Sequence, residues 1–323
     1  MKPRLLPDIQ FLPTDGGLSV RAPGHEASLH APGLYPWFER VCPFLDGDHS
    51  VVDLVEKLSP PAAQRVLGLV EFLLREGFAR DAEFDLPHTL SPATRSLHAG
   101  MIEYLARLAD SPERRFQSYR ECAPVAVGSG RLLAATALAL LATGVAHVRV
   151  RVLPGGADGA SDTDRAGLLE SAAPLLHRDP EARLEFADGE PADLPVDAGA
   201  LLYAADRPDA VQAARLRALA ARRGLRYGAA YPDGDRVVIS EVTVNAVGGN
   251  PKSPTAQSAS GGEVPGVGCA APGRYFGGPA AAVAGNQLCR NLLQHAAGLA
   301  ELEAEPETGP MVLDLPAASF RPR

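Results

Sequence analysis

A glycine-rich turn lies between an apolar strand and a long apolar helix near the middle of the chain. The strand is Pro124-Val125-Ala126-Val127, the turn is Gly128-Ser129-Gly130, and the helix extends over 132–142 before Gly144. Such a turn leaves backbone N–H groups at the start of a helix, where they can hold phosphate groups. The same residues also suit a tight strand-to-helix turn that serves only the fold. The sequence therefore indicates either a nucleotide cradle or a structural turn.

Lysine and cysteine are scarce, and this restricts the chemistry that the chain can perform. The 323 residues include three lysines, Lys2, Lys57 and Lys252, so none lies between positions 57 and 252. The four cysteines form no Cys-x-x-Cys pair, and the eight histidines form no cluster with metal-ligand spacing. We therefore expect no metal site, no cofactor and no disulfide framework.

Length and charge bound the class of protein. A chain of 323 residues suits two domains of about 100–200 residues each. The net charge of −8 disfavours binding to nucleic acid or to an anionic membrane surface. No apolar run is long enough for a membrane-spanning helix, and the N-terminus lacks the apolar core of a secretory signal. A cytoplasmic globular protein is expected.

The glycine turn belongs to a segment, 123–323, in which strands and helices alternate. This order predicts an α/β domain with a mainly parallel sheet covered by helices. Residues 248–273 lack periodicity and are predicted to form a long loop. Strands are expected at 124–127, 147–152, 182–186, 199–203, 225–229, 236–244 and, as a closing edge strand, 311–315. Helices are expected at 132–142, 164–176, 208–223 and 279–299.

The first 85 residues predict a small winged-helix module. Short β-like segments separated by glycine and proline come first, at 5–12, 18–21 and 27–30. Three helices follow, at 35–44, at 51–58 with Ser50 as a cap, and from Pro60 or Pro61 to Gly77. Residues 86–122 are predicted to be a helical linker between this module and the α/β domain.

The α/β half resembles the ThiF/ubiquitin-activating (E1-like) superfamily. The residues that carry the resemblance are Val125 to Leu133, Gly144-Val145 before the next strand, and the late helix around Gly285. The resemblance implies a Rossmann-type fold and a site that adenylates a substrate with ATP. Gly128 and Gly130 match the family's phosphate turn, Arg165 its arginine, and Asp206 its metal-binding aspartate.

This match is incomplete at several positions. Leu133 stands where the family has its third glycine, the second strand ends without an acidic residue, and the lysine that would neutralise phosphate is missing. We therefore interpret Gly128, Gly130, Arg165 and Asp206 as a degenerate nucleotide site, and we expect the chain not to be an enzyme.

The N-terminal half resembles the PqqD-like peptide recognition element. Leu45 to Val55 and Leu67 to Phe78 carry this resemblance, and with the ThiF-like half behind them they resemble the Ocin-ThiF-like partner proteins of thiazole- and oxazole-forming, thiopeptide-type clusters. The resemblance implies a non-catalytic homodimer that binds a precursor's leader peptide and delivers it to a YcaO-type cyclodehydratase. The leader would add a strand to an open sheet edge. The expected peptide-binding residues are Glu26, Ala27, Ser28, Leu29, His30, Arg65, Val66, Leu69, Val70, Leu73 and Leu74.

Two other functions stay open. The chain could be an active, ATP-dependent adenylating enzyme of the ThiF type. It could also be a winged-helix nucleic-acid-binding protein, a hypothesis that depends on five arginines on or after one helix of the α/β half. The net charge argues against this last function. The five arginines are Arg215, Arg217, Arg222, Arg223 and Arg226.

Overall fold

The structure is a computed structural model that describes residues 1–22, 24–31, 33–153, 165–187, 194–244, 273, 275–300 and 310–322. Contacts between Cα atoms divide the chain into two compact units, Met1–Phe116 and Gln117–Arg323. The boundary falls inside a helix of the segment 86–122, so the predicted linker contributes to both units. No described helix combines the length and the apolar character needed to cross a membrane.

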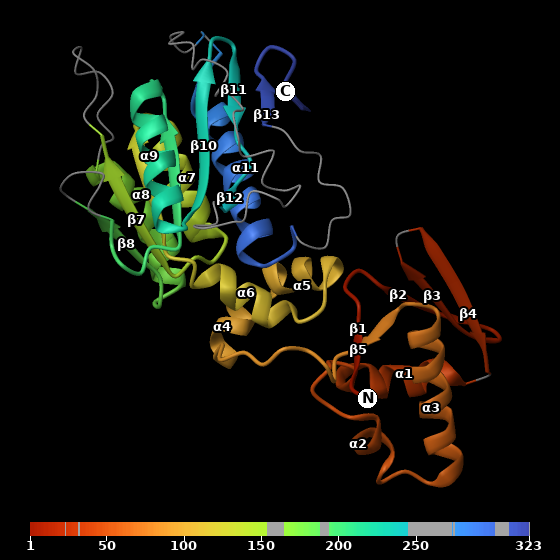
Figure 1. Ribbon diagram of the computed structural model, residues 1–323. Coiled ribbons are helices and arrows are strands. Elements are labelled where there is room, and N and C mark those ends of the chain that lie inside the picture. Colours follow the sequence, from red (N-terminus) through yellow and green to blue (C-terminus); the bar gives the residue numbers. More distant parts are fainter. Residues whose placement is uncertain are drawn as a thin grey trace, which may run out of the picture. The chain divides into compact units, whose positions relative to one another are not determined.

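The N-terminal unit consists of two small antiparallel sheets and several helices (Figure 1). One sheet pairs β1 with β5, and the other has the order β2-β3-β4. The strands are β1 (Pro3–Leu5), β2 (Gln10–Thr14), β3 (Gly17–Ala22), β4 (His25–His30) and β5 (Ala79–Asp81). The helices are α1 (Leu34–Val41), the 3₁₀ turn η1 (Cys42–Phe44), α2 (Val51–Val55), α3 (Pro60–Arg75), α4 (Pro92–Leu97), α5 (Ala99–Leu108) and the first part of α6 (Pro112–Arg120).

Local signals in the sequence explain where these helices begin and end. Ser50 caps α2 in a capping box with Asp53, in which each side chain binds the other residue's backbone N–H. Helix α3 begins at Pro60, where the missing N–H costs nothing, and its end is followed by Gly77 at φ 73°. The buried face of α3 and the inner faces of β3 and β4 form one core with α1 and Phe78.

A cluster of ion pairs ties strand β1 to helix α6 within this unit. Arg4 pairs with Glu113, and Arg80 binds Asp85 through two hydrogen bonds of 2.7 and 2.6 Å. Burial raises the pKa of Glu113 and Asp85, but the hydrogen bonds from Arg4 and Arg80 outweigh it and hold both pKa values below their usual range. Both carboxylates are therefore ionised and paired at neutral pH.

The C-terminal unit is built on a nine-stranded sheet with the order β14-β13-β11-β10-β9-β6-β7-β8, in which β12 also pairs with β10. The strands β8, β7, β6, β9 and β10 are parallel, as the alternating sequence pattern predicts. The strands are β6 (Pro124–Ser129), β7 (His147–Val152), β8 (Arg183–Phe186), β9 (Ala200–Ala205), β10 (Arg226–Asp233), β11 (Arg236–Ile239), β12 (Thr243–Val244), β13 (Met311–Asp314) and β14 (Ser319–Pro322). The helices are α7 (Gly130–Ala142), α8 (Arg165–Arg178), α9 (Ala210–Arg223) and α11 (Gly278–Ala296).

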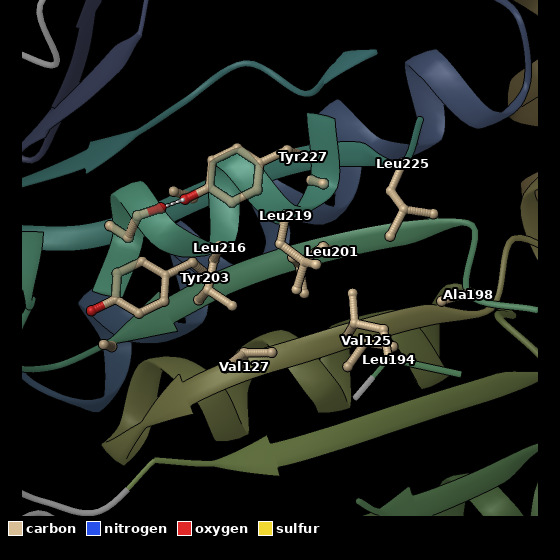
Figure 2. Packing of buried hydrophobic residues seen from close by; sticks show 14 of the residues in the cluster. Val125, Val127, Leu194, Ala198, Leu201, Tyr203, Leu216, Leu219, Leu225 and Tyr227 are labelled. Carbon is tan, nitrogen blue, oxygen red and sulfur yellow. Dashed lines mark hydrogen bonds between the residues drawn. The ribbon is translucent and has the colours of Figure 1, made fainter. Parts of the chain in front are cut away.

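Helices cover both faces of the parallel strands. Helix α9 covers one face, and α7 and α11 pack together on the other (Figure 1). Burial of each large apolar side chain beneath α9 stabilises the unit by about 1.5–3 kcal/mol. These side chains, drawn in Figure 2, include Val125, Val127, Leu201, Tyr203, Leu216, Leu219 and Tyr227.

Glycines let backbones approach each other on the α7–α11 side. A Cβ atom at Gly285 of α11 would lie 3.0 Å from Ala135 C and from Thr136 N of α7. A Cβ atom at Gly228 of β10 would lie 2.9 Å from a methyl carbon of Leu288. A side chain at either position would therefore push α11 away from its neighbours.

Two expectations about the sheet are corrected by the structure. The segment 311–315 is not the closing edge, because β13 lies between β11 and β14. The edge strand is β14, which the sequence did not predict. The single strand expected over 236–244 is divided into β11 and β12, which both pair with β10. The loop predicted at 248–273 lies outside the described residues except for residue 273.

Candidate functional site

The glycine turn lies at the point where the order of the parallel strands reverses. Strand β6 is central, and the chain first builds β7 and β8 on one side and then β9 and β10 on the other. In open α/β sheets, the crevice at the carboxyl ends of the strands at such a reversal is where ligands bind. The topology therefore places residues 128–130 and the end of β9 at one candidate site.

Both glycines of the turn are required by close neighbours. Gly128 has φ 156°, and a Cβ atom there would lie 1.7 Å from the carbonyl oxygen of Ala204 in β9. Gly130 has φ 75°, and a Cβ atom there would lie 2.4 Å from Cγ of Asp206. Only glycine combines these conformations with so little space. The turn thus brings the first residues of α7 against the residue that follows β9.

The carboxylate of Asp206 occupies the N-terminus of α7. Arg131 N donates to Asp206 Oδ2 at 2.9 Å, and Leu132 N donates to Oδ1 at 2.8 Å. These are the N–H groups that an N-cap side chain usually binds, but Ser129, the N-cap residue, makes no such side-chain bond. The first turn of α7 therefore already binds an anion, and the anion comes from the end of a different strand.

The loop that carries Asp206 is held at both ends. Asp206 N donates to Ser129 O at 3.1 Å, which ties the backbone of Asp206 to the glycine turn. Asp209 N donates to the hydroxyl of Tyr203 at 2.9 Å, and the Asp209 carboxylate caps α9. Asp206 as a residue is partly buried, so it is not sealed from solvent.

The structure does not bring Arg165 into this group. Arg165 begins α8 at the same edge of the sheet, but its guanidinium lies over the ring of Phe186 in β8, with Cζ 5.2 Å from the ring centroid. Strand β8 is separated from β6 by β7. Arg131 and Arg207 are adjacent to the groups that form the site, and both are exposed. The sequence patterns did not single out either arginine.

Buried thiols next to the sheet are poor nucleophiles. Burial raises the pKa of Cys122 to about 12, and it also raises the pKa of the fully buried Cys289. The thiolate is the reactive form of cysteine, so both groups stay inert at neutral pH.

Strand β4 carries the five N-terminal residues that the sequence assigned to peptide binding. Among the described residues, β4 pairs only with β3, so its other edge has no strand beside it. Ala27 and Leu29 turn toward the core, while Glu26, Ser28 and His30 are exposed. Hydrogen bonds from Arg21 and Ser19 of β3 lower the pKa of Glu26 and hold its side chain across the sheet.

Most of the expected contact residues on α3 are core residues. Val66, Leu69, Val70 and Leu73 are 2% exposed or less, and they pack in the core of the unit. Their helical spacing reflects this packing, so these four side chains do not line a surface groove. Arg65 is exposed and Leu74 is partly buried.

The five arginines of the nucleic-acid hypothesis do not form one group. Arg215, Arg217 and Arg222 are exposed on α9. Arg223 donates to the carbonyl oxygen of Leu194 at 2.7 Å, and Arg226 is partly buried in β10. Arg223 is exposed but bound to the backbone of its own unit, and Arg226 is less exposed than the four arginines of α9.

Similarity to solved structures shows the fold. The whole chain aligns with 94% of the structure of E. coli MccB, with a TM-score of 0.57 and 12% identity. The fold is that of MccB. The parallel sheet with helices on both faces agrees with the Rossmann-type fold that the resemblance of the α/β half implies. The structure of PaaA also matches, over 85% of this chain and 96% of PaaA, with a TM-score of 0.57 and 14% identity. No protein-family model matches the sequence, and neither does any curated protein.

The MccB structures correct the expectation that this chain is not an enzyme. One of them is the microcin C7 biosynthetic enzyme MccB in complex with N-formylated MccA, and it aligns with the whole chain at a TM-score of 0.55 and 12% identity. Another contains MccB with ATP, with a TM-score of 0.57. The chain therefore shares its fold with an enzyme, even though it lacks the lysine and the acidic residue.

The hydrogen bonds of Asp206 go beyond the metal-binding role that the resemblance implies. The resemblance singled out Asp206 as a metal-binding aspartate, but its hydrogen bonds to α7 connect residues 74 and 75 positions apart in the chain. One sequence signal points to these hydrogen bonds: Ser129-Gly130 begins a helix, and an aspartate follows the end of a neighbouring strand.

Proposed function

We propose that the chain is an ATP-dependent enzyme that adenylates a ribosomally made peptide. The observation that carries the proposal is the anion-binding first turn of α7 at the strand reversal, where two backbone N–H groups hold a carboxylate. The same N–H groups suit a phosphate, because a helix N-terminus favours negative charge. The presence of MccB with ATP among structures of this fold supports the choice of nucleotide.

In the proposed reaction, a carboxylate oxygen of the peptide attacks the α-phosphorus of ATP. The bond between this phosphorus and the bridging oxygen breaks, and pyrophosphate leaves with the electron pair. The first turn of α7 would hold phosphate oxygens, and the exposed side chains of Arg131 and Arg207 would offset their charge in place of a lysine.

The residues present fit a bound Mg²⁺ ion. Asp206 offers hard carboxylate oxygens at the first turn of α7, and one carboxylate together with substrate phosphates is a common way to hold this ion. When bound, Mg²⁺ would neutralise charge on the phosphates. Asp206 would hold it, and the hydrogen bond from Asp206 N to Ser129 O would keep that carboxylate beside the glycine turn.

We infer that strand β4 binds the peptide by strand addition. Its free edge offers backbone N–H and C=O groups, and its exposed Ser28 and His30 leave the outer face open. Solved structures of MccB with MccA support a second, non-nucleotide ligand for this fold. Hydrogen exchange should show new protection of the amides of residues 25–30 when the peptide binds, with no change in β14.

Pyrophosphate exchange tests the proposed reaction. The full chain, Mg²⁺, ATP and a candidate precursor peptide should exchange labelled pyrophosphate into ATP only when all are present. Asp206→Asn should lower the rate by at least about 100-fold, on the scale of losing one charge-stabilising group. Asp209→Asn is the matched control, because asparagine also caps a helix, and its rate should stay near that of the wild type. No exchange and no ATP binding by calorimetry would overturn the proposal.

A second function rests on the same strand. The bound precursor would also be delivered to a YcaO-type cyclodehydratase of a thiopeptide-type cluster, as the N-terminal resemblance implies. Azoline formation by such a partner should then fall when this chain is omitted. The homodimer remains a prediction of the ThiF-like resemblance, and sedimentation velocity checks it. The cytoplasmic location remains a prediction from the N-terminal sequence and the sparse, unpaired cysteines.

A further inference from the structure

The Asp206 carboxylate and a nucleotide phosphate would need the same two N–H groups. The backbone N–H groups of Arg131 and Leu132 already donate to the Asp206 carboxylate, with N···O distances of 2.9 and 2.8 Å. A hydrogen bond between an N–H group and an anion is short and directional, so one N–H group does not serve two anions fully. A phosphate that enters the first turn of α7 therefore has to displace this carboxylate.

We propose that Asp206 is an internal competitor that closes the phosphate seat until it is displaced. This proposal rests on the proposed function and describes how that site is regulated. Entry of the nucleotide is coupled to a rotation of one side chain. In the closed state, the Asp206 carboxylate accepts hydrogen bonds from the first turn of α7. In the open state, the nucleotide phosphate takes these hydrogen bonds, and the carboxylate lies beside it.

The surroundings of Asp206 allow this motion without unfolding. The hydrogen bond from Asp206 N to Ser129 O fixes the backbone, so only the side chain has to turn. The residue is partly buried and meets solvent, so the side chain is not enclosed on all sides. The absence of a side chain at Gly130 is what lets the carboxylate reach α7, since a Cβ atom there would lie 2.4 Å from Asp206 Cγ.

Ser129 supplies a reserve cap for the open state. It stands at the N-cap position with φ −154° and ψ 159°, the conformation from which a serine hydroxyl can accept from the first turn, yet it makes no cap bond. Its hydroxyl can accept one N–H that Asp206 gives up. Helix α7 therefore need not fray during exchange.

Measuring ATP binding without a divalent cation tests whether Asp206 competes with phosphate for the N–H groups of α7 or only repels it by its charge. Calorimetry in EDTA is applied to the full-length wild type, to Asp206→Ala, which removes the cap, and to Asp206→Asn, which keeps a capping oxygen and loses the charge. Asp206→Ala should bind ATP about ten-fold tighter than the wild type, the equivalent of one charge-assisted hydrogen bond. Asp206→Asn should lie closer to the wild type than to Asp206→Ala.

Hydrogen exchange gives a readout that does not depend on activity. At least one of the amides of residues 131 and 132 should lose protection in Asp206→Ala and regain it when ATP is added, while circular dichroism confirms that the variant is folded. Equal ATP affinity of Asp206→Asn and Asp206→Ala, or no tightening in Asp206→Ala, would overturn the competition. Failure of the wild type to bind ATP even with Mg²⁺ would instead overturn the proposed function.

Discussion

Arg4 and Glu113 form a two-point ion pair, with Arg4 Nη1 2.8 Å from Glu113 Oε2 and Arg4 Nη2 2.7 Å from Glu113 Oε1. The two residues are 109 positions apart, and they join strand β1 to helix α6 inside the N-terminal unit. The Glu113 side chain is 7% exposed, so its partner determines whether its charge is tolerated there.

We expect Arg4→Met to lower the free energy of unfolding of the N-terminal unit by about 2–4 kcal/mol, because it leaves a buried carboxylate without its main partner. Trp37 is the single tryptophan and lies in α1, so its fluorescence during urea unfolding reports on this unit. Arg107→Met is the control, since its ion pair with Asp8 is about half exposed, and its effect should stay below about 1 kcal/mol. Equal effects of the two variants would contradict this role of Arg4.

The N-terminal unit should lose stability in acid. Asp85 and Glu113 have folded-state pKa values below their usual range, so each contributes stability above its unfolded pKa, near 3.9 and 4.3, and loses it as the pH falls through its folded value. The urea midpoint reported by Trp37 should therefore fall between about pH 5 and pH 2. Glu113→Gln should have a lower midpoint at pH 7 and a shallower fall, and an unchanged slope would speak against the pair.

Helix α11 should tolerate no larger residue at Gly285. Gly285→Val should destabilise the C-terminal unit by about 1–3 kcal/mol, because a Cβ atom there would already lie 3.0 Å from the backbone of α7. Ala282→Val, at an exposed position of the same helix, carries the same β-branched penalty without the clash. Thermal unfolding followed by far-ultraviolet circular dichroism compares the two, and the prediction fails if their midpoints fall equally.

Gly128→Ala should damage the sheet itself. Its Cβ atom would meet the carbonyl oxygen of Ala204, and the neighbouring strand cannot withdraw without breaking the β6–β9 pairing. We expect a loss of about 3 kcal/mol or more, and with it the loss of pyrophosphate exchange. Gly100→Ala in α5 is the matched control: outside its own stretch of helix, no atom lies within 4 Å of a Cβ added there. Helix propensity should therefore make this variant slightly more stable than the wild type. A Gly128→Ala variant as stable as the wild type would contradict the close approach of β9.

Local patterns predicted most of the elements around the site. Alternating valines at 148, 150 and 152 mark β7, and the apolar run before Gly128 marks β6, which is buried throughout. Each pattern is recognisable within a few residues. The capping box at Ser50 and the proline at the start of α3 likewise act within one turn of helix. These signals need no knowledge of distant contacts.

The contacts that define the candidate site are distant in the chain. Nothing local distinguishes Asp206, which binds α7, from Asp209, which caps the helix that follows it. On α3, the same helical spacing suits either a buried core or a ligand groove, and the burial of Leu69 and Leu73 shows that here it serves the core. The sequence does not predict strand β14, because its four residues carry no strand pattern of their own. It is recognised as a strand only by its pairing with β13.

The Arg4–Glu113 pair also has a consequence for synthesis on the ribosome. The ion pair and the pairing of β1 with β5 can both form once residues 1–116 have left the ribosome. Strand β6 can pair with β9 only after residue 205 has been made, and β13 pairs with β14, which ends at Pro322. Domains generally fold as units, with N-terminal ones first during translation. We therefore expect the N-terminal unit, with strand β4 formed, to fold on the nascent chain before the glycine turn acquires its neighbouring strand.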